Sequence, residues 1–342
     1  MEAETVESAA RPAKDQPGVR SRPVARFIQQ FALIPVLAVA MVVGSFVHDA
    51  FLTKANLVNV LQQSSELAVI VLAEALILIV GKFDLSLEST VGIAPMFGAW
   101  LVATPAIGGL GLGINPYLII AVMLATGMAI GLFNGWMVAK LKLNAFMVTL
   151  AMLILLRGVT IGLTNGRTLY DLPTPITYLG SARWLGVPAS VWLAGFLFLV
   201  VGLFLRYHSF GRSIYAIGGN AEAARAAGIR VERVIWTVYI AGSGLAAFAG
   251  VLLTGRLASV LSGQGQNMIF TVFAACVIGG ISLSGGRGTM FGALTGVLLL
   301  GIIANILTLS QIQSYWIDAA FGAVILIALV IAHVTSGGEQ ET

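Results

Sequence analysis

Long apolar stretches recur along almost the entire chain, and short segments between them carry most of the charged residues. A run of about 20 apolar residues is long enough to cross a bilayer as a helix. Only 10% of the 342 residues are charged, whereas about a quarter of the residues in a soluble domain are charged. The sequence therefore predicts an all-α, polytopic membrane protein.

Breaks at glycine, proline, asparagine and charged residues divide the apolar sequence into ten predicted transmembrane helices. These run over residues 27–47, 57–80, 86–104, 116–138, 144–163, 189–205, 234–254, 268–282, 289–309 and 314–334. The third and eighth are short for a full crossing, which leaves a broken or re-entrant path open for both. Non-helical backbone at membrane depth is tolerated only where protein or a water-filled cavity covers it.

The distribution of lysine and arginine predicts the orientation in the membrane. With the N-terminus inside, 14 of the 19 basic residues fall in cytoplasmic segments, as the positive-inside rule requires. Both termini are therefore expected in the cytoplasm, with a disordered tail over residues 1–26 and a short tail over residues 335–342. The transmembrane domain is expected over residues 27–334.

The longest predicted cytoplasmic loop contains the polar segment Gly211–Ile229. Gly218-Gly219 is expected to break what precedes it, and Asn220 is a good N-cap for a short helix over about residues 219–229. Glu222 suits the helix dipole in the first turn, and Gly228 suits the C-terminal stop. So short a helix is marginal in water. We therefore favour a helix held by another subunit over an ordinary surface connector.

Two short motifs need a structural interpretation. Leu283-Ser-Gly-Gly-Arg287 resembles the signature motif of ATP-binding-cassette ATPases. However, the chain has no phosphate-binding loop of the Gly-x-x-x-x-Gly-Lys-Ser/Thr type, so no nucleotide site is expected. A tight turn between the eighth and ninth spans explains it better. The segment 80–86 is similar to 278–284, which suggests two related halves but is too short to establish them.

Four stretches together resemble the permease subunit of bacterial ATP-binding-cassette importers for monosaccharides, of the ribose, xylose and galactose type. The stretches are Asn56–Ser65, Gly81–Ser86, Gly211–Ile229 and Val277–Gly288, the last continuing through Gly292, Gly296, Gly301 and Asn305. The closest match is Gly211–Ile229. Leu156-Arg-Gly158 and Thr164-Asn-Gly166 add to the resemblance, which covers the chain from about residue 50 to its end.

The resemblance implies the rest of a transport machine in the bacterial inner membrane. Two permease subunits, identical or paralogous, would form the pathway, and a periplasmic binding protein would deliver the sugar. Two cytoplasmic ATPase subunits would bind the ATP, so no cofactor is expected in this chain, and no nucleic acid partner is expected. The short cytoplasmic helix would report ATP binding to the membrane. Its carried-over residues are Arg212, Gly219, Asn220, Glu222, Arg225 and Gly228.

Charged residues in and beside the second and third predicted spans depart from the family pattern. Glu74, Lys82 and Glu88 stand where the family commonly has uncharged residues, and Met268–Thr271 replaces a stretch that in the family often carries two acids. Such residues usually face a cavity or a partner. Candidate pathway residues are Glu74, Lys82, Asp84, Ser86, Glu88, Arg157 and Asn305. The substitutions relative to the family would mark a different substrate branch, such as a polyol, deoxysugar or modified sugar.

An alternative for this set is an internal group of ion pairs that fixes a break in a helix. Lys82 would then neutralise Asp84 or Glu88, while Glu74 is too far along a straight helix to pair with it. Arg157 is expected to pair with an acid from another span or with a carbonyl near the outer face. Both interpretations remain open from the sequence.

The longest predicted outer loop, Thr164–Ser190, combines charged and aromatic residues. Arg167, Asp171 and Arg183 suit a docking face for a soluble binding protein. The alternative is a simple belt of Trp and Tyr at the membrane interface.

Two rival functions compete with the importer subunit. A stand-alone secondary transporter for a small polar solute would explain the intramembrane charge but not the capped cytoplasmic helix. An intramembrane enzyme would need a nucleophile–base pair or a metal set, and no suitable spacing is present. Catalytic and metal-binding residues are therefore not expected.

Overall fold

The structure is a computed structural model in which residues 33–335 are described. The predicted tail 1–26 lies outside the described residues, as do residues 336–342. Thirteen α-helices, α2 to α14, occur in the described part of the chain. Ten of them coincide with the ten predicted spans: α2 (Leu33–Val47), α3 (Lys54–Ile79), α4 (Leu87–Val102), α5 (Pro116–Gly135), α6 (Ala145–Thr164), α8 (Ala189–Tyr207), α11 (Val231–Leu257), α12 (Met268–Ile278), α13 (Met290–Leu309) and α14 (Ser314–Thr335).

Short elements connect the long helices. They are the 3-10 turn η1 (Pro105–Ile107), the π-helical turn η2 (Trp136–Lys140) that extends α5, the helices α7 (Thr174–Ser181), α9 (Ser209–Gly219) and α10 (Ala221–Ala226), and the two-stranded hairpin β1 (Arg183–Trp184) and β2 (Val187–Pro188). In the hairpin, Arg183 pairs with Pro188 and Trp184 with Val187. The all-α, polytopic fold class is confirmed.

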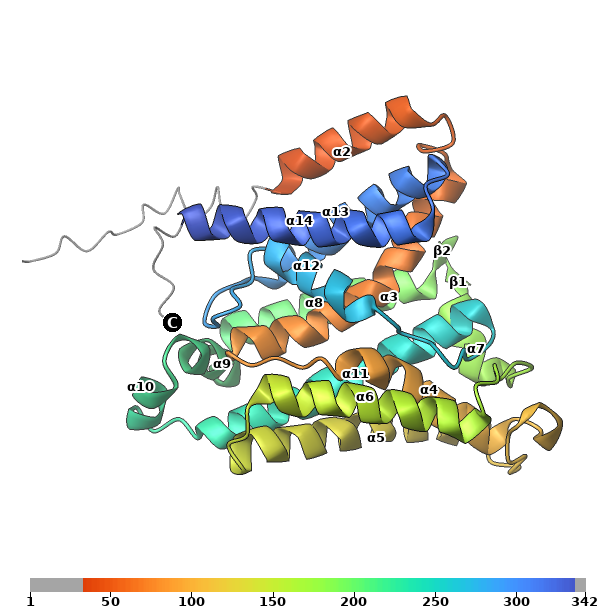
Figure 1. Ribbon diagram of the computed structural model, residues 1–342, viewed down its shortest axis with the longest axis horizontal. Helices are drawn as coiled ribbons and strands as arrows, with labels where there is room; N and C mark the ends of the chain where they lie inside the picture. Colours follow the sequence, from red (N-terminus) through yellow and green to blue (C-terminus); the bar gives the residue numbers. More distant parts are fainter. Residues whose placement is uncertain (1–32, 336–342) are drawn as a thin grey trace, which may run out of the picture.

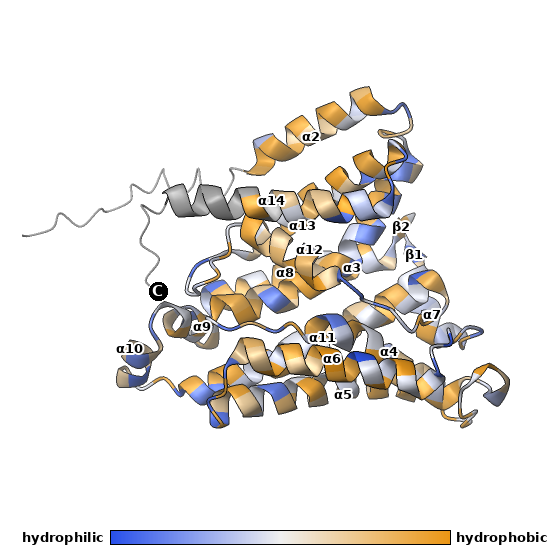
Figure 2. Ribbon diagram, in the orientation of Figure 1, coloured by the Kyte–Doolittle hydropathy of each residue, from blue (hydrophilic) through white to orange (hydrophobic). Residues whose placement is uncertain are grey.

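Six helices in the described part of the chain are long and apolar enough to cross a membrane: α3, α5 with η2, α6, α8, α11 and α13. The helices α2, α4 and α12 are apolar but shorter. Apolar residues dominate the helix bodies, whereas many of the polar residues gather at the turns (Figure 2). This is the distribution expected of a multi-pass protein, because only satisfied backbone and apolar side chains are stable in lipid.

The helices α3 and α11 form the centre of the bundle (Figure 1). In α3, 83% of the most apolar window is buried and in α11 61%, against 28% in α5, α6 and α8. The outer helices therefore pack around these two. The helices α5 and α11 pack closely, and a Cβ on Gly127, Gly131 or Gly135 would collide with α11. Small residues at this spacing let membrane helices pack closely.

The connecting elements lie at opposite ends of the bundle (Figure 1). One end carries α9 and α10, and the other carries α7, the β1–β2 hairpin and η1. This separation agrees with the prediction that the Gly211–Ile229 and Thr164–Ser190 loops lie on opposite sides of a membrane.

The short helices α4 and α12 begin inside the bundle. After α3 ends, the chain turns back along it in an extended stretch and α4 starts in the interior (Figure 1). From the opposite end, the stretch after α11 runs inward to the start of α12. The 11 residues of α12 span about 16 Å at about 1.5 Å per residue, roughly half of a hydrocarbon core of about 30 Å. Both segments that were short in the sequence therefore begin in the interior of the bundle, and α12 alone is too short for a full crossing.

The two similar segments 80–86 and 278–284 follow their helices in the same way. Gly81 and Gly280 both have φ of +77°. The next amides, of Lys82 and Ile281, bond back to the carbonyls of Ile77 and Cys276 at 3.0 and 2.9 Å. This is the Schellman stop, in which glycine accepts the left-handed conformation. The repeated sequence therefore encodes a repeated helix ending.

Candidate functional site

The two short helices α4 and α12 meet at the carboxylate of Glu88. Glu88 lies in the first turn of α4, and its Oε2 accepts a hydrogen bond from the amide of Ile269, in the first turn of α12, at 3.2 Å. Its Oε1 pairs with Nη2 of Arg157 on α6 at 2.7 Å. The N-terminal amides of a helix lack intrahelical acceptors and favour a negative charge. One buried carboxylate thus joins α4, α6 and α12.

Arg157 pairs with an acid from another span, as expected. The alternative pairing of Glu88 with Lys82 is wrong, because Glu88 is occupied by Arg157. Lys82 forms no ion pair with any residue in the described part of the chain. Lys82 lies directly after the Schellman stop of α3, so it is outside the helix and precedes the stretch that turns into the bundle.

Asp84 holds the extended stretch that leads into α4. Its Oδ1 accepts from the amide and hydroxyl of Ser86 at 2.9 and 2.6 Å. Ser86 Oγ in turn accepts from Asn134 Nδ2 on α5 at 2.8 Å, and the hydroxyl of Tyr239 on α11 donates to the Phe83 carbonyl at 2.8 Å. The stretch is therefore held by hydrogen bonds within itself and by side chains of two neighbouring helices, α5 and α11. The structure brings the two candidate pathway residues Asp84 and Ser86 together.

Glu74 joins this cluster from α3. Its Oε1 lies 3.5 Å from the amide of Asp84, and both carboxyl groups are fully buried. The second carboxyl oxygen of each acid has no hydrogen-bond partner in the structure. Glu74 therefore packs beside Asp84, as a buried polar contact between α3 and the stretch that precedes α4.

Gln264 is a structural residue that the sequence did not reveal. Pro95 lies inside α4 and lacks an amide hydrogen, so the carbonyl of Val91 loses its helical partner. The Gln264 side-chain amide donates to that carbonyl at 3.1 Å and also to Gly250 and Thr254. The signal in the sequence was a proline within an apolar span, which predicts a free carbonyl and a donor elsewhere.

The first half of α3 divides its polar residues between two faces. Gln62 donates to the Gly180 carbonyl at 3.1 Å, and Ser65 donates to Ser190 Oγ at 2.8 Å. Glu66 is buried and accepts from Arg256 Nε on α11 at 2.7 and 2.9 Å. These three bind the helix to its neighbours. We did not predict the Glu66–Arg256 pair from the sequence.

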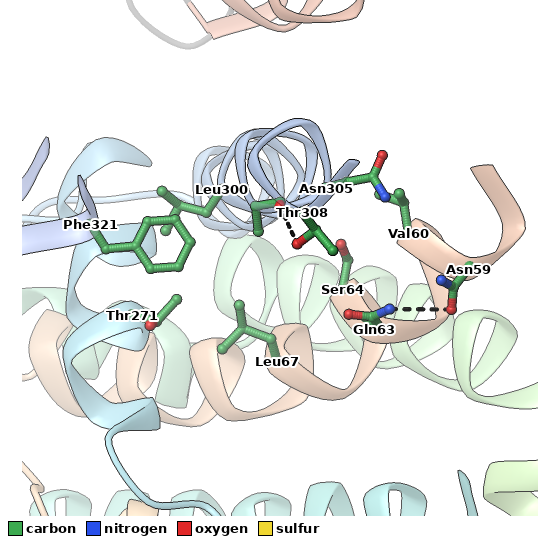
Figure 3. Close-up of a pocket in the computed structure, with 12 residues that line it drawn as sticks. Asn59, Val60, Gln63, Ser64, Leu67, Thr271, Leu300, Asn305, Thr308 and Phe321 are labelled. Carbon is green, nitrogen blue, oxygen red and sulfur yellow. Dashed lines mark hydrogen bonds between the residues drawn. The ribbon is translucent and has the colours of Figure 1, made fainter. Parts of the chain in front are cut away.

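Three other polar residues of α3, Asn59, Gln63 and Ser64, line a cavity of about 200 Å³ between α3, α12, α13 and α14 (Figure 3). We call its six polar lining residues the amide groove: Asn59, Gln63, Ser64, Thr271, Asn305 and Thr308. Asn305 exchanges two hydrogen bonds with Asn56, at 2.8 and 2.9 Å. Of the seven candidate pathway residues, only Asn305 lines this cavity.

The two helices α9 and α10 replace the single short helix expected near residues 219–229. Asn220 caps α10 through a 2.9 Å bond from the Ala223 amide. Gly228 has φ of +84°, and the Ile229 amide bonds to the Ala224 carbonyl. Both caps are as predicted. The preceding helix α9 ends at Gly219, at the expected Gly218-Gly219 pair, and the chain bends at Asn220.

The polar residues of this end are largely exposed. Glu222 and Arg225 project from α10, and Arg225 pairs with Glu232 at the start of α11 at 2.7 Å. Arg212 on α9 donates to the Tyr207 carbonyl at 3.1 Å. The side chains of α10 are therefore available to a partner, with one already engaged in a surface ion pair.

Close packing requires a glycine at position 218, in the last turn of α9. A Cβ on Gly218 would lie 1.8 Å from the Ile79 carbonyl oxygen and 2.4 Å from the Gly286 amide nitrogen. That amide itself donates to the Ile79 carbonyl at 2.9 Å. We call this contact between α9, the end of α3 and the turn before α13 the glycine junction.

Tyr215 reinforces the same contact. Its hydroxyl donates to the Gly288 carbonyl at 2.9 Å. Burial raises the pKa of the Tyr215 phenol above its ordinary value, so the hydroxyl keeps its proton at neutral pH. Tyr215 and Gly218 therefore fix α9 against the turn before α13 and the end of α3.

The three candidate docking residues lie at the opposite end. Arg167, Asp171 and Arg183 are all exposed, with Arg183 in β1. Arg183 and Lys54 line a cavity of about 810 Å³ between the hairpin and the start of α3. Leu185, at the tip of the hairpin, is 92% exposed. We did not predict this exposed leucine.

Comparisons with known proteins place the chain among transport permeases. A family described as branched-chain amino acid transport system / permease component matches residues 56–329. The ribose import permease protein of Escherichia coli (strain K12) is 36% identical over 308 residues, which cover 89% of this chain and 93% of that protein. No solved structure matches the chain.

Two further relatives are named for other solutes. The L-arabinose ABC transporter permease protein of Azospirillum brasilense is 30% identical, covering 95% of this chain and 92% of that protein. The autoinducer 2 import system permease protein of Salmonella choleraesuis (strain SC-B67) is 32% identical, covering 87% and 84%. These are transport permeases and not enzymes. Both the similarity and the apolar helices show that this multi-pass inner-membrane protein belongs to the permease family of ABC sugar importers.

Proposed function

We propose that this chain is the membrane subunit of an importer for a monosaccharide or related polyol, driven by separate ATPase subunits. A periplasmic binding protein would deliver the solute, and a second permease subunit would complete the pathway. ATP would bind only to the ATPase subunits. The termini, α9 and α10 would then lie in the cytoplasm, and the hairpin and α7 in the periplasm.

The observation that carries this proposal is the glycine junction, in which α9 contacts the end of α3 and the turn before α13. The short helix α10 projects from one end of the bundle, and its Glu222 and Arg225 are exposed. The preceding helix α9 is in close contact with α3 and with the turn before α13. A partner that moves α10 would therefore move the ends of two central elements. A solute carrier that works alone has no use for such a contact.

The experiment replaces the two exposed side chains of α10. We expect the Glu222→Gln/Arg225→Gln variant, assembled with the ATPase, to hydrolyse ATP without solute uptake. Its thermal stability should be unchanged, because exposed ion pairs contribute about 0–1 kcal/mol. Uptake and hydrolysis are measured together in proteoliposomes. Glu232→Gln, which breaks the same ion pair from α11, is the matched control and should stay coupled. Coupled transport by the double variant would contradict the role of α10.

Charge reversal at the opposite end tests the binding-protein face. We expect Arg167→Glu/Arg183→Glu to reduce the stimulation of ATP hydrolysis by the binding protein, because both guanidinium groups are exposed there. Rim charges act mainly on association, so the defect should depend on salt concentration. Basal hydrolysis is the internal control. Unchanged stimulation at low salt would place the docking surface elsewhere.

A stand-alone secondary transporter is the second candidate, favoured by the buried acids Glu74 and Asp84. Intramembrane carboxyl groups occur in proton and ion pathways. Reconstituted uptake by this chain alone, without ATP or ATPase, would support that alternative and exclude the importer subunit.

A further inference from the structure

We propose that the amide groove is a binding site for a neutral, polyhydroxylated solute on its way through the membrane. This inference rests on the proposed function and adds the location and chemistry of the site. The groove, and not the buried acids near α4, would contact the solute.

The position of the groove is unusual for a surface in a membrane. Gln63 lies nine residues into α3, about 13 Å along the helix at about 1.5 Å per residue, and both Asn59 and Gln63 are exposed. Among the described residues, their only side-chain bond is to each other, from Gln63 Nε2 to Asn59 Oδ1 at 3.2 Å (Figure 3). Lipid offers amides no hydrogen bonds, so this face needs a polar occupant.

Ser64 is an independent indication of a missing partner. Its residue is 4% exposed, it lines the cavity, and its hydroxyl has no hydrogen-bond partner in the structure. A Cβ on Gly301 would lie 2.2 Å from this hydroxyl oxygen, so glycine at that position leaves the hydroxyl room. Buried polar groups normally find a partner, and a solute hydroxyl would supply one here.

The lining identifies the class of solute. Every polar side chain in the groove is an amide or a hydroxyl, and no charged residue lines it. Amides and hydroxyls both donate and accept, which matches the hydroxyls of a sugar or polyol. Leu67, Leu300 and Phe321 supply an apolar wall for the carbon skeleton (Figure 3). The acids predicted for the pathway have other partners, since Glu88 is held by Arg157 and Asp84 by Ser86.

The groove also continues toward the end that carries the hairpin. Asn59 lines both this cavity and the larger one beside Lys54 and Arg183. A solute released at that end would therefore meet the α3 amides first. This is the end that the proposed function places in the periplasm.

The test uses the single cysteine of the chain, Cys276, which is buried and gives a low labelling background. Gln63→Cys and Thr308→Cys are labelled in native membranes with a charged, water-soluble methanethiosulfonate. The control is Ile154→Cys, at an apolar α6 position that is 64% exposed. D-Ribose and myo-inositol are the neutral probes, and gluconate is the charged comparison.

We expect both groove variants to be labelled and the α6 variant to resist labelling. Saturating ribose or inositol should slow labelling by about tenfold at ten times the dissociation constant, and gluconate should not. Either variant suffices if the other fails to fold. Resistance of both folded groove variants, as when lipid or a second copy covers the face, would overturn the proposal. So would labelling that neither neutral probe slows.

The labelling needs neither ATPase nor binding protein, so it separates this inference from the proposed function. A groove that binds sugar in a chain that proves uncoupled from any ATPase would leave the site standing and reject the importer. A coupled importer whose groove binds neither neutral probe would support the importer and reject the proposed site.

Discussion

Replacing Gly218 by alanine is expected to destabilise the protein and abolish coupled transport, although it adds one methyl group. The new Cβ would be placed 1.8 Å from the Ile79 carbonyl oxygen, and that obstacle is backbone rather than a flexible side chain. Overpacking of this kind costs about 1–3 kcal/mol. The α9 helix must therefore move away from α3 and break the glycine junction. The measurements are the thermal midpoint of the purified permease and ATP-driven uptake with its partners.

Gly219 provides the matched control. It lies next to Gly218 in the same last turn of α9, yet an added Cβ would meet nothing within 4 Å. Gly219→Ala should therefore retain both stability and uptake. Equal behaviour of the two alanine variants would show that helix propensity, and not the contact with Ile79, governs this position.

Removing one partner of the Glu88–Arg157 pair is expected to be the most destabilising single change in the interior. Arg157→Met leaves the Glu88 carboxylate, whose side chain is 5% exposed, with only the Ile269 amide. Breaking a buried pair costs about 3–5 kcal/mol, because an uncompensated charge remains. The free energy of unfolding in mixed detergent and SDS micelles measures the loss.

The double variant distinguishes a charge effect from a packing effect. Glu88→Gln/Arg157→Met removes both charges but keeps an oxygen that can accept from the Ile269 amide. It should recover most of the stability lost by Arg157→Met, with a coupling energy of about 1–3 kcal/mol in the double-mutant cycle. The exposed pair of Arg225 and Glu232 serves as a comparison, since such pairs contribute about 1 kcal/mol at most. Additive losses at Glu88 and Arg157 would show that their pairing stabilises nothing.

The helices and their caps were accessible from local sequence signals. Apolar runs of the right length located ten helices, and Asn220 and Gly228 marked the two ends of α10, because capping depends on residues a few positions apart. The short third and eighth spans likewise left a broken path open, and both helices begin inside the bundle. Each of these inferences needs only neighbours along the chain.

The pairing of side chains across the bundle was less accessible. That Arg157 meets an acid was predictable, but the choice of Glu88 over others depends on where α4 starts in space. Glu66 and Arg256 are 190 positions apart, and no local pattern relates them. The sequence predicted Gly218 only as part of a helix ending and missed its contact with the Ile79 carbonyl. Close contact with a distant carbonyl and a local break both favour glycine.

The meeting of α4 and α12 at Glu88 has a consequence for how the chain is made. Glu88 precedes Ile269 by 181 residues. The hydrogen bond between them therefore cannot form until those residues have been synthesised. Neither inward-running stretch can satisfy its backbone in lipid by itself. A chain that ends before α12 therefore lacks the Ile269 amide that Glu88 binds, and the site where α4 and α12 meet is assembled only after α12 has been synthesised.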